Sequence, residues 1–597
     1  MKQWVYVWLL GLVVLLAALL RLYHLDQYPP SLNWDEVSHG YNAWAIWKTG
    51  ADEWGIRVPL VFRAFGDFKL PVYIYSLVPW VAIGGLNAWT VRLSSALAGI
   101  MSVGLTYGLV VQIGTVQRLL GRGKTIGWQR VGLLAAFMVA VAPWTIFLSR
   151  MAVEANLASM LFIAAVYFFH LGLAQKLRGE GKAWAFLMAG LMAGLTLFTY
   201  NSFRIFTPMM TVAAVLVYAP AWEWQLFNRW WKRLRLPKRF GYEPEKLACS
   251  CHLIGLAVFL LFFMMTSYQL MYTNAGQARA ANIAVLDQGM INRINEARGT
   301  SELPTLVTRL IHNKLTYVAV VSGKNYMSFF NPNFWYVSGG HHYQFSVPGM
   351  YLLPTVNLLF VVFGLAWLWK WPRPSLWFVI GWILLAPLPA SPTRDNPHTL
   401  RIITMLPMMQ VVTAWGLYQT VKWVQTKFSK DRKQIISGIL YGIYMVIVLG
   451  YLGNFMKVYT GTYASEYAWA WQSGSKEMVE YVMAHYQTAP VIYVTKYYGE
   501  PHAFVQFYSQ WDVRDNQQNR VWEYRDAGTS VAWYWVNGLG KIRFINDWEI
   551  GDITPVAGAV VLSQPQNPYD SQPESTISDQ FGRVIYNIDT IDNTDLN

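Results

Sequence analysis

Residues 4–23, WVYVWLLGLVVLLAALLRLY, contain one charged side chain, Arg21, in an otherwise almost wholly apolar run. A helix needs about 20 such residues to cross the hydrocarbon of a bilayer. The run is longer than the apolar core of a typical signal peptide, and no A-x-A-like cleavage site follows it. It therefore predicts an uncleaved transmembrane helix.

Ten further apolar segments of similar character follow. They are 91–113, 131–149, 153–173, 184–200, 204–219, 252–271, 349–369, 375–390, 400–421 and 435–456. Backbone polar groups in lipid must be satisfied within the segment, which favours helices over strands. The sequence thus predicts a polytopic α-helical membrane protein with about 11 transmembrane helices.

The composition supports lipid as the solvent. Only 13% of the 597 residues are charged and 54% are hydrophobic, whereas soluble domains carry about 25% charged residues. Trp and Tyr concentrate at the headgroup layer, and this chain has 30 Trp and 35 Tyr.

The charge distribution predicts the orientation. Segment 71–86 is apolar but short and contains Pro79, so we expect it to lie as a helix at the outer interface. The loops then assigned to the cytoplasm, 114–130, 174–183, 220–251, 370–374 and 422–434, carry 21 Lys/Arg against 5 Asp/Glu. Positively charged loops stay on the cytoplasmic side of a membrane. The N-terminus is therefore predicted to lie in the cytoplasm, and the protein to lie in the cell membrane (plasma or inner). This bias accounts for the net charge of +14, so no nucleic-acid partner is indicated.

Three large parts are then extracytoplasmic: loop 24–90, loop 272–348 and the tail 457–597. The tail has 9 Lys/Arg and 17 Asp/Glu, unlike the transmembrane domain 1–456. Its pattern predicts an amphipathic helix over 473–487. Strands are predicted over 490–495, 530–536, 541–545, 556–562 and 584–588. We expect a soluble α/β domain there, serving acceptor recognition or packing.

An acidic pair, Asp35-Glu36, stands out in loop 24–90. One carboxylate beside a membrane can act as a general base toward an incoming hydroxyl, while its neighbour raises its pKa or binds a cation. Lys69 suits a phosphate as a compact charge. The structural alternative is that the acids cap a helix starting near Val37 and that Lys69 only snorkels to the interface.

Three stretches in order carry a resemblance to a known family. They are RLYHLDQYPPSLNWDEVSHGYNAWAIWKTG (21–50), GDFKLPVYIYSLVPW (66–80) and AWTVRLSSALAGIMSVGLTYGLV (88–110). This order of a span, an acidic pair, a Lys-x-Pro element and an R-L-x-S-A span resembles the GT-C glycosyltransferases. Within them it is similar to the family 39 type, the protein O-mannosyltransferases and lipid A aminoarabinose transferases, over roughly residues 15–220.

The resemblance implies roles for three positions in these stretches and for two further residues, Arg150 and Glu154. Asp35 would be the catalytic base and Glu36 its partner, and Lys69 would contact the phosphate of a polyprenyl-phosphate sugar. Glu154 would be a second catalytic acid, although the family often has Asp there. Arg150 beside it would contact the donor phosphate, and the structural alternative is an ordinary interfacial Arg150–Glu154 pair.

A later cluster, PTRDNPHTLR (392–401), begins the tenth segment. Arg and His at the outer start of an apolar helix are costly and often functional, and Arg401 can hold a phosphate by a forked contact. By resemblance His398 and Arg401 face the site, whereas the alternative is an Arg that anchors in the headgroups. Candidate substrate contacts are Tyr73, Asn201 and Arg204. No metal site is indicated, because the adjacent His341 and His342 rarely point the same way.

The function expected is inverting transfer of a sugar from a polyprenyl-phosphate donor to a protein, lipid or glycan acceptor on the outer face. No cofactor is required, although a divalent cation would be compatible with the chemistry. A membrane transporter or lipid flippase is the first alternative; its ionisable groups would lie mid-span. A catalytically inactive relative that binds glycan is the second.

Overall fold

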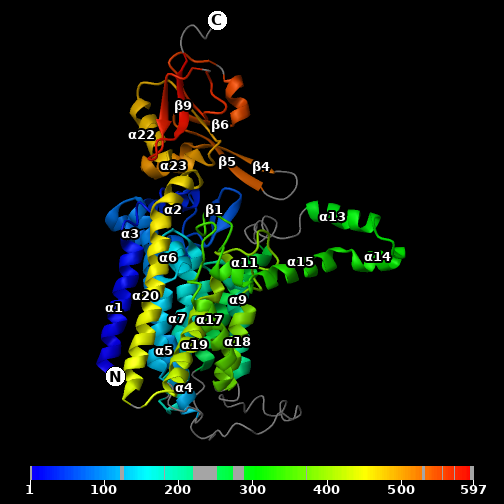
Figure 1. Cartoon of the computed structure of the whole chain (residues 1–597). Helices are drawn as coiled ribbons and strands as arrows, with labels where there is room; N and C mark the ends of the chain where they lie inside the picture. Colours follow the sequence, from blue (N-terminus) through cyan, green and yellow to red (C-terminus); the bar gives the residue numbers. More distant parts are fainter. Residues whose placement is uncertain are drawn as a thin grey trace.

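The structure is a computed structural model. It describes residues 3–120, 127–180, 182–218, 252–272, 288–371, 373–429, 431–526, 532–553, 555–570 and 572–591. A long helical body, a lateral helical arm and a β-rich C-terminal domain make up the molecule (Figure 1). The N-terminus lies at the end of the body opposite to the C-terminal domain.

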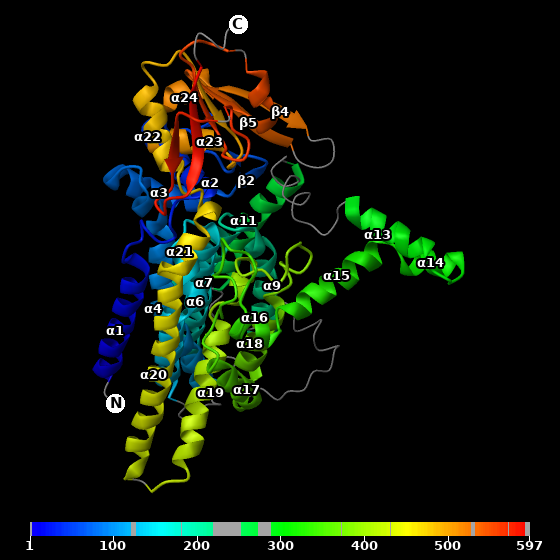
Figure 2. The same ribbon diagram turned by 45° about the horizontal axis from the view of Figure 1, so that its top comes forward.

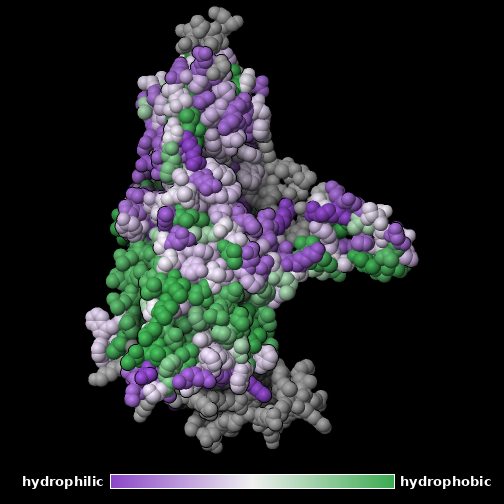
Figure 3. Space-filling model, viewed as in Figure 1, coloured by the Kyte–Doolittle hydropathy of each residue, from purple (hydrophilic) through white to green (hydrophobic). Residues whose placement is uncertain are grey.

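Each of the eleven apolar segments contains a helix. The body helices are α1 (Gln3–Leu22), α4 (Ala88–Leu119), α5 (Trp128–Val141), α6 (Pro143–Ser149), α7 (Glu154–Leu177), α8 (Trp184–Leu197), α9 (Asn201–Tyr218), α11 (His252–Tyr272), α17 (Asn357–Trp367) with η4 (Leu368–Lys370), α18 (Arg373–Leu385), η5 (Arg401–Met405), α19 (Met408–Gln425) and α20 (Arg432–Thr460). An apolar belt crosses the face of the body seen in Figure 3.

Length and composition single out fewer spans than eleven. Among the described residues, α1, α4, α7, α11 and the helix from Arg432 to Glu466 are long and apolar enough to cross a membrane. A sixth span results if α5 and α6, which meet at 59°, count as one; Pro143 has no N–H to continue the hydrogen-bond ladder. The membrane class is therefore supported, and the count of eleven stays a prediction.

The first connection folds at the end of the body nearest the C-terminal domain. It contains α2 (Trp34–Thr49), α3 (Pro71–Gly84) and an antiparallel hairpin of β1 (Phe62–Ala64) and β2 (Asp67–Lys69). The helix expected at the interface is α3, which lies beside α2 at the upper end of α1 (Figure 1). Sequence patterns did not predict the hairpin, because strands of three residues are too short to show a period.

The C-terminal domain is built on one seven-stranded sheet in the order β4-β5-β6-β3-β7-β9-β8. Its strands are β3 (Ile492–Thr495), β4 (Val521–Asp526), β5 (Ala532–Leu539), β6 (Ile542–Ile545), β7 (Val560–Ser563), β8 (Ser575–Ser578) and β9 (Val584–Thr590). Its helices are α21 (Thr462–Glu466), η6 (Ala468–Trp471), α22 (Ser475–His485), α23 (Pro501–Tyr508), α24 (Val513–Asn519) and η7 (Asp547–Asp552). The central strand β3 pairs in parallel with β6 and β7. The predicted helix and five predicted strands correspond to α22, β3, β5, β6, β7 and β9.

One apolar core joins this domain to the first connection. Val37 and Tyr41 of α2 belong to the same buried cluster as Phe507 of α23 and Ile542 of β6. The first connection and the tail, far apart in sequence, therefore pack together at the same end of the body.

The arm comprises α13 (Gln288–Gly299), α14 (Thr305–Ile311) and α15 (Lys314–Ser328). It projects sideways from the body in both ribbon views (Figures 1 and 2). The short helix α16 (Pro332–Tyr336) returns the chain to the body, where Trp335 is buried.

Candidate active site

The first turn of α2 gives its two acids different surroundings. Asn33 caps the helix: its side-chain oxygen accepts from the Glu36 N–H at 2.9 Å, and a Glu36 oxygen accepts from the Asn33 N–H at 3.2 Å. This reciprocal capping box is the structural role expected for an acid at this position. α2 thus begins at Trp34 rather than near Val37.

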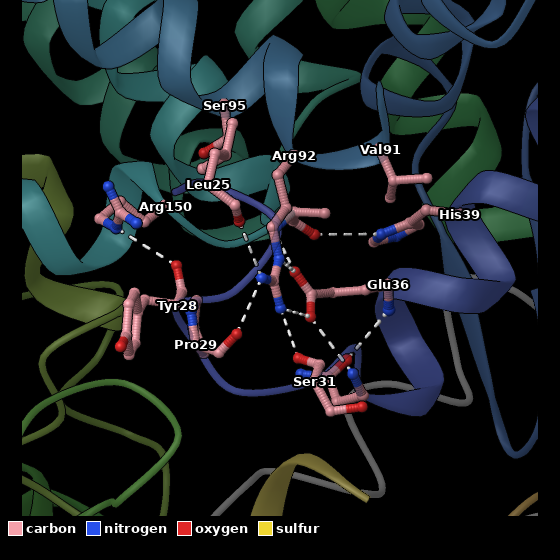
Figure 4. Close-up of polar contacts among 12 residues, drawn as sticks. Leu25, Tyr28, Pro29, Ser31, Glu36, His39, Val91, Arg92, Ser95 and Arg150 are labelled. Atoms are coloured by element: carbon pink, nitrogen blue, oxygen red, sulfur yellow. Dashed lines mark hydrogen bonds and ion pairs between the residues drawn. The ribbon is translucent and has the colours of Figure 1, made fainter. Parts of the chain in front are cut away.

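Glu36 pairs with the buried Arg92 (Figure 4). We call these two residues the anchor cluster. Arg92 Nε and Nη2 donate to the two Glu36 oxygens at 3.0 and 3.1 Å, and the Ala152 N–H donates to Oε1 at 2.8 Å. The guanidinium also donates to the carbonyls of Leu25, Pro29 and Ser31. Because Glu36 is 1% exposed and accepts four hydrogen bonds, it fixes α2 against α4 and the start of α7.

Asp35 faces a cavity instead. The cavity contains about 670 Å³ of empty space. Its wall comes from α2, β2, the turn before α7, the turn before α9 and the segment at 344–345. We call Asp35, Lys69, His39 and Glu154, which all line it, the cavity cluster.

Two ion pairs order the cavity cluster. Lys69 Nζ lies 2.6 Å from Asp35 Oδ1, with 40% of the Asp35 side chain exposed and 12% of the Lys69 side chain. His39 Nε2 lies 3.2 Å from Glu154 Oε1, and His39 Nδ1 lies 3.2 Å from the Ala152 carbonyl oxygen. Both ring nitrogens therefore face oxygens, so the ring is held in one orientation between α2 and the start of α7.

The electrostatics of the cavity keep Lys69 charged. Burial alone lowers the pKa of Lys69, but the carboxylates of Asp35, Glu154 and Asp67 outweigh that effect and raise it. The ammonium group therefore stays protonated throughout the physiological range. A site with a fixed cation beside a half-exposed carboxylate can both bind an anion and accept a proton.

The structure brings together Asp35, Glu36, Lys69, Glu154 and Asn201 at this cavity. His398 and Arg401 lie just behind its wall at Phe345 and Leu400. The His398 ring is 5.1 Å from that of Phe345, and Arg401 Nη1 donates to Thr393 Oγ1 at 2.8 Å. Burial and the Arg401 charge lower the pKa of His342, which packs 5.4 Å from His398.

Three further predicted site residues are not among the residues that line the cavity. Arg150 is 1% exposed and donates to the carbonyls of Leu20, His24 and Tyr28, so it holds the end of α1 rather than lining the cavity. Tyr73 is fully buried, and its hydroxyl donates to the Val91 carbonyl at 3.1 Å. Arg204 donates to the Leu197 carbonyl and to Asn201 and Gln269. These hydrogen bonds are made within the protein, and the roles of Arg150 toward phosphate and of Tyr73 and Arg204 toward substrate stay predictions.

His39, Gln344 and Phe345 line the cavity but did not emerge from the sequence. His39 stands four residues after Asp35 and three after Glu36, and that spacing puts all three near one face of a helix. This signal was available in the sequence. Gln344 and Phe345 approach from a distant loop, for which no local pattern exists.

The C-terminal domain covers the outer side of α2. Gly499, after β3, has a φ of +114°, and a Cβ there would lie 2.2 Å from the Trp34 ring. Any side chain at this position would be strained by the positive φ and would clash with Trp34, so the position requires glycine. The Tyr41 hydroxyl also donates to the Trp511 carbonyl at 3.0 Å, and Gln580 donates to the Pro30 carbonyl at 2.8 Å.

Fold and site together define a multi-helix membrane protein with a polar cavity between its first connection and its helical body. Comparison with protein-family models and with curated protein sequences finds no match.

Solved structures similar to the chain are glycosyltransferases of the GT-C fold. One is ArnT from Cupriavidus metallidurans bound to undecaprenyl phosphate, with 12% identity, a TM-score of 0.48 and 98% of each chain covered. Another is the oligosaccharyltransferase AglB from Archaeoglobus fulgidus with an inhibitory peptide and a dolichol-phosphate, with 12% identity and a TM-score of 0.47. That match covers 85% of this chain and 64% of AglB.

The Archaeoglobus fulgidus oligosaccharyltransferase tethered with an acceptor peptide gives 11% identity, a TM-score of 0.47 and coverage of 63% of its length. The chain thus spans less than two thirds of the archaeal enzyme.

Proposed function

We propose that this protein is an inverting glycosyltransferase that moves a sugar from a polyprenyl-phosphate donor to an acceptor on the outer face of the membrane. The observation that carries the proposal is Asp35: a half-exposed carboxylate over a polar cavity, held at 2.6 Å by the Lys69 ammonium. The helical part, 1–456, supplies the reaction site, and the domain 457–597 covers it.

The proposed reaction is a single displacement. The acceptor hydroxyl attacks the anomeric carbon while its proton passes to an Asp35 oxygen. The bond between that carbon and the phosphate oxygen breaks, and its electron pair leaves with the polyprenyl phosphate. Because one carboxylate acts and no covalent intermediate forms, the anomeric configuration inverts.

Cations of the protein stabilise the departing phosphate. Lys69 lines the cavity and carries a charge that its neighbours hold in place. Arg401 and His398 do not line the cavity, but His398 packs against Phe345 and both flank Leu400 in the sequence, two residues of its wall. We propose that they add positive charge to the phosphate site. With these charges the proposed step needs no metal ion.

The remaining acids position the base. Glu36 is committed to Arg92 and to two backbone N–H groups, so it orients the turn that carries Asp35. Glu154 lies at the N-terminus of α7, where a carboxylate is favoured, and orients His39. Glu154 also faces the cavity and is the second candidate for a proton-transfer role.

Donor turnover by the purified protein tests this function. The protein in lipid nanodiscs is incubated with polyprenyl-phosphate carrying radiolabelled mannose or aminoarabinose, with envelope lipid or peptide as acceptor. Release or transfer of the sugar, with inversion seen by NMR of the product, supports the proposal. Movement of labelled lipid across liposomes without any release from either donor would establish a transporter instead.

A further inference from the structure

The arm of α13, α14 and α15 leaves a large apolar surface uncovered. Within α15 no residue is fully buried. Leu306, Leu310 and Leu315 are 73%, 66% and 80% exposed. Contiguous exposed apolar surface of this kind marks a binding surface.

The apolar residues of the arm lie on one side. In α14 they occupy positions 306, 307, 310 and 311, one face of a helix. The space-filling view shows the apolar side of the arm turned toward the end of the molecule that carries the apolar belt (Figure 3). The polar side faces the C-terminal domain.

The root of the arm sits at the edge of that belt. The Tyr326 hydroxyl donates to the Leu384 carbonyl at 2.9 Å, at the last turn of α18. The Asn325 amide donates to the carbonyls of Ser391 and Thr393 at 2.9 and 3.1 Å. The arm therefore leaves the body at the height where a body helix ends.

Its charges complement anionic headgroups. Residues 288–328 contain Arg293, Arg298, Arg309, Lys314 and Lys324 against Glu296 and Glu302. Arg293 also bridges the two long helices by donating to the Tyr317 hydroxyl at 2.7 Å, and Arg298 ties α13 to the end of α14 by donating to the His312 carbonyl at 2.7 Å. The arm is thus a braced unit with an apolar side and a basic excess, as in helices that lie in a membrane interface.

We propose that the arm lies on the bilayer surface beside the helical body, with Leu306, Leu310 and Leu315 inserted below the headgroups of anionic phospholipid. Anionic phospholipid is favoured over a protein partner on this surface, because the apolar side of the arm faces the same membrane plane as the apolar belt of the body. The inference does not depend on the glycosyl-transfer reaction.

Depth-dependent quenching tests the position of the arm. Leu306→Cys in a Cys249→Ser/Cys251→Ser background is labelled with an environment-sensitive fluorophore and reconstituted in nanodiscs of phosphatidylglycerol and phosphatidylcholine. Asn295→Cys, exposed on α13, is the matched control. We expect doxyl-labelled lipid to quench position 306 at least about threefold more than position 295, at an insertion depth of about 5–10 Å.

Further measurements make the result decisive. Leu315→Cys repeats the measurement if the first variant does not fold, as judged by gel filtration. In nanodiscs of phosphatidylcholine alone the quenching should weaken, since the basic residues lose their partners. Equal iodide access at 306 and 295 would overturn the proposal, and so would cross-linking of position 306 between two copies of the chain.

Discussion

The cavity cluster and the anchor cluster begin at adjacent residues, and both acids pair with a cation, yet the two acids differ in exposure and in the number of hydrogen bonds they accept. Asp35 has 40% of its side chain exposed and pairs with Lys69. Glu36 is 1% exposed and accepts four hydrogen bonds. The difference shows that one turn of α2 serves two purposes: Glu36 secures the helix, and its rigidity leaves Asp35 available for chemistry.

The largest expected effect is on catalysis by Asp35→Asn. Loss of a general base lowers kcat by about 10²- to 10⁴-fold, while the thermal unfolding temperature stays close to that of the wild type. Donor turnover and thermal unfolding in detergent measure both. Asp26→Asn, an exposed acid of the same connection, is the control and should leave turnover unchanged. Full activity of Asp35→Asn would move the base to Glu154.

Arg92→Met, in the anchor cluster, should lower the stability of the fold, unlike Asp35→Asn in the cavity cluster. It leaves Glu36 charged and buried without its guanidinium partner, which costs about 3–5 kcal/mol. Thermal or urea unfolding in detergent measures this loss. The double variant Arg92→Met/Glu36→Gln should recover part of it.

The control for this stability effect is Arg178→Met, which removes an exposed pair with Glu180. Exposed pairs contribute about 0–1 kcal/mol. If Arg92→Met proved as mild as Arg178→Met, the anchor cluster would not hold α2.

Lys69→Met is expected to act mainly on donor binding. Removing a charged hydrogen-bond partner costs about 1.5–3 kcal/mol, which should raise KM for the polyprenyl-phosphate donor and also lower kcat. Lys48→Met, an exposed lysine at the end of α2, should change neither. An unchanged donor KM for Lys69→Met would remove Lys69 from the phosphate site.

The smallest expected effect is on the pH dependence of stability, through Glu53 where the first connection packs against the C-terminal domain. Burial raises the pKa of Glu53 from 4.5 to about 7, against the opposing effects of Arg520 and Asn42, and the neighbouring Asp52 also raises it. A carboxyl with a raised folded-state pKa stabilises the fold fully below its unfolded value and loses that contribution as pH rises through 7.

Stability should therefore fall by about 1–3 kcal/mol between pH 5 and 8, as unfolding at several pH values would show. Glu53→Gln should flatten part of this dependence. Glu500, whose pKa burial also raises to about 7, contributes the rest with the same sign. An unaltered slope in Glu53→Gln would assign the dependence to other groups.

Much of this architecture was predictable because hydropathy and charge act locally. The apolar segments, the helix α22 and most strands of the tail follow from period and composition. The strands β4 and β8 were missed since they lie at the two edges of the sheet, where burial leaves little pattern.

The site was predictable only where residues are near in sequence. Asp35 and Lys69 belong to one loop, and Glu154 to a motif with known resemblance. Arg150 was predicted at the phosphate site because it lies close to Glu154 in the sequence. The sequence does not reveal that its guanidinium donates to backbone carbonyls at the end of α1. Burial of a charge by backbone carbonyls is a tertiary property that the sequence does not display.

The contact of Gly499 with Trp34 has a consequence for the order of events in biosynthesis. Trp34 is made before the segment that covers it, because Gly499 lies more than 450 residues later in the sequence. The apolar core that contains Val37 and Tyr41 is incomplete until α23 and β6 exist. A nascent chain therefore holds α2 without these packing partners while the whole helical body is being made, and the core of the first connection closes only after the C-terminal domain has been synthesised.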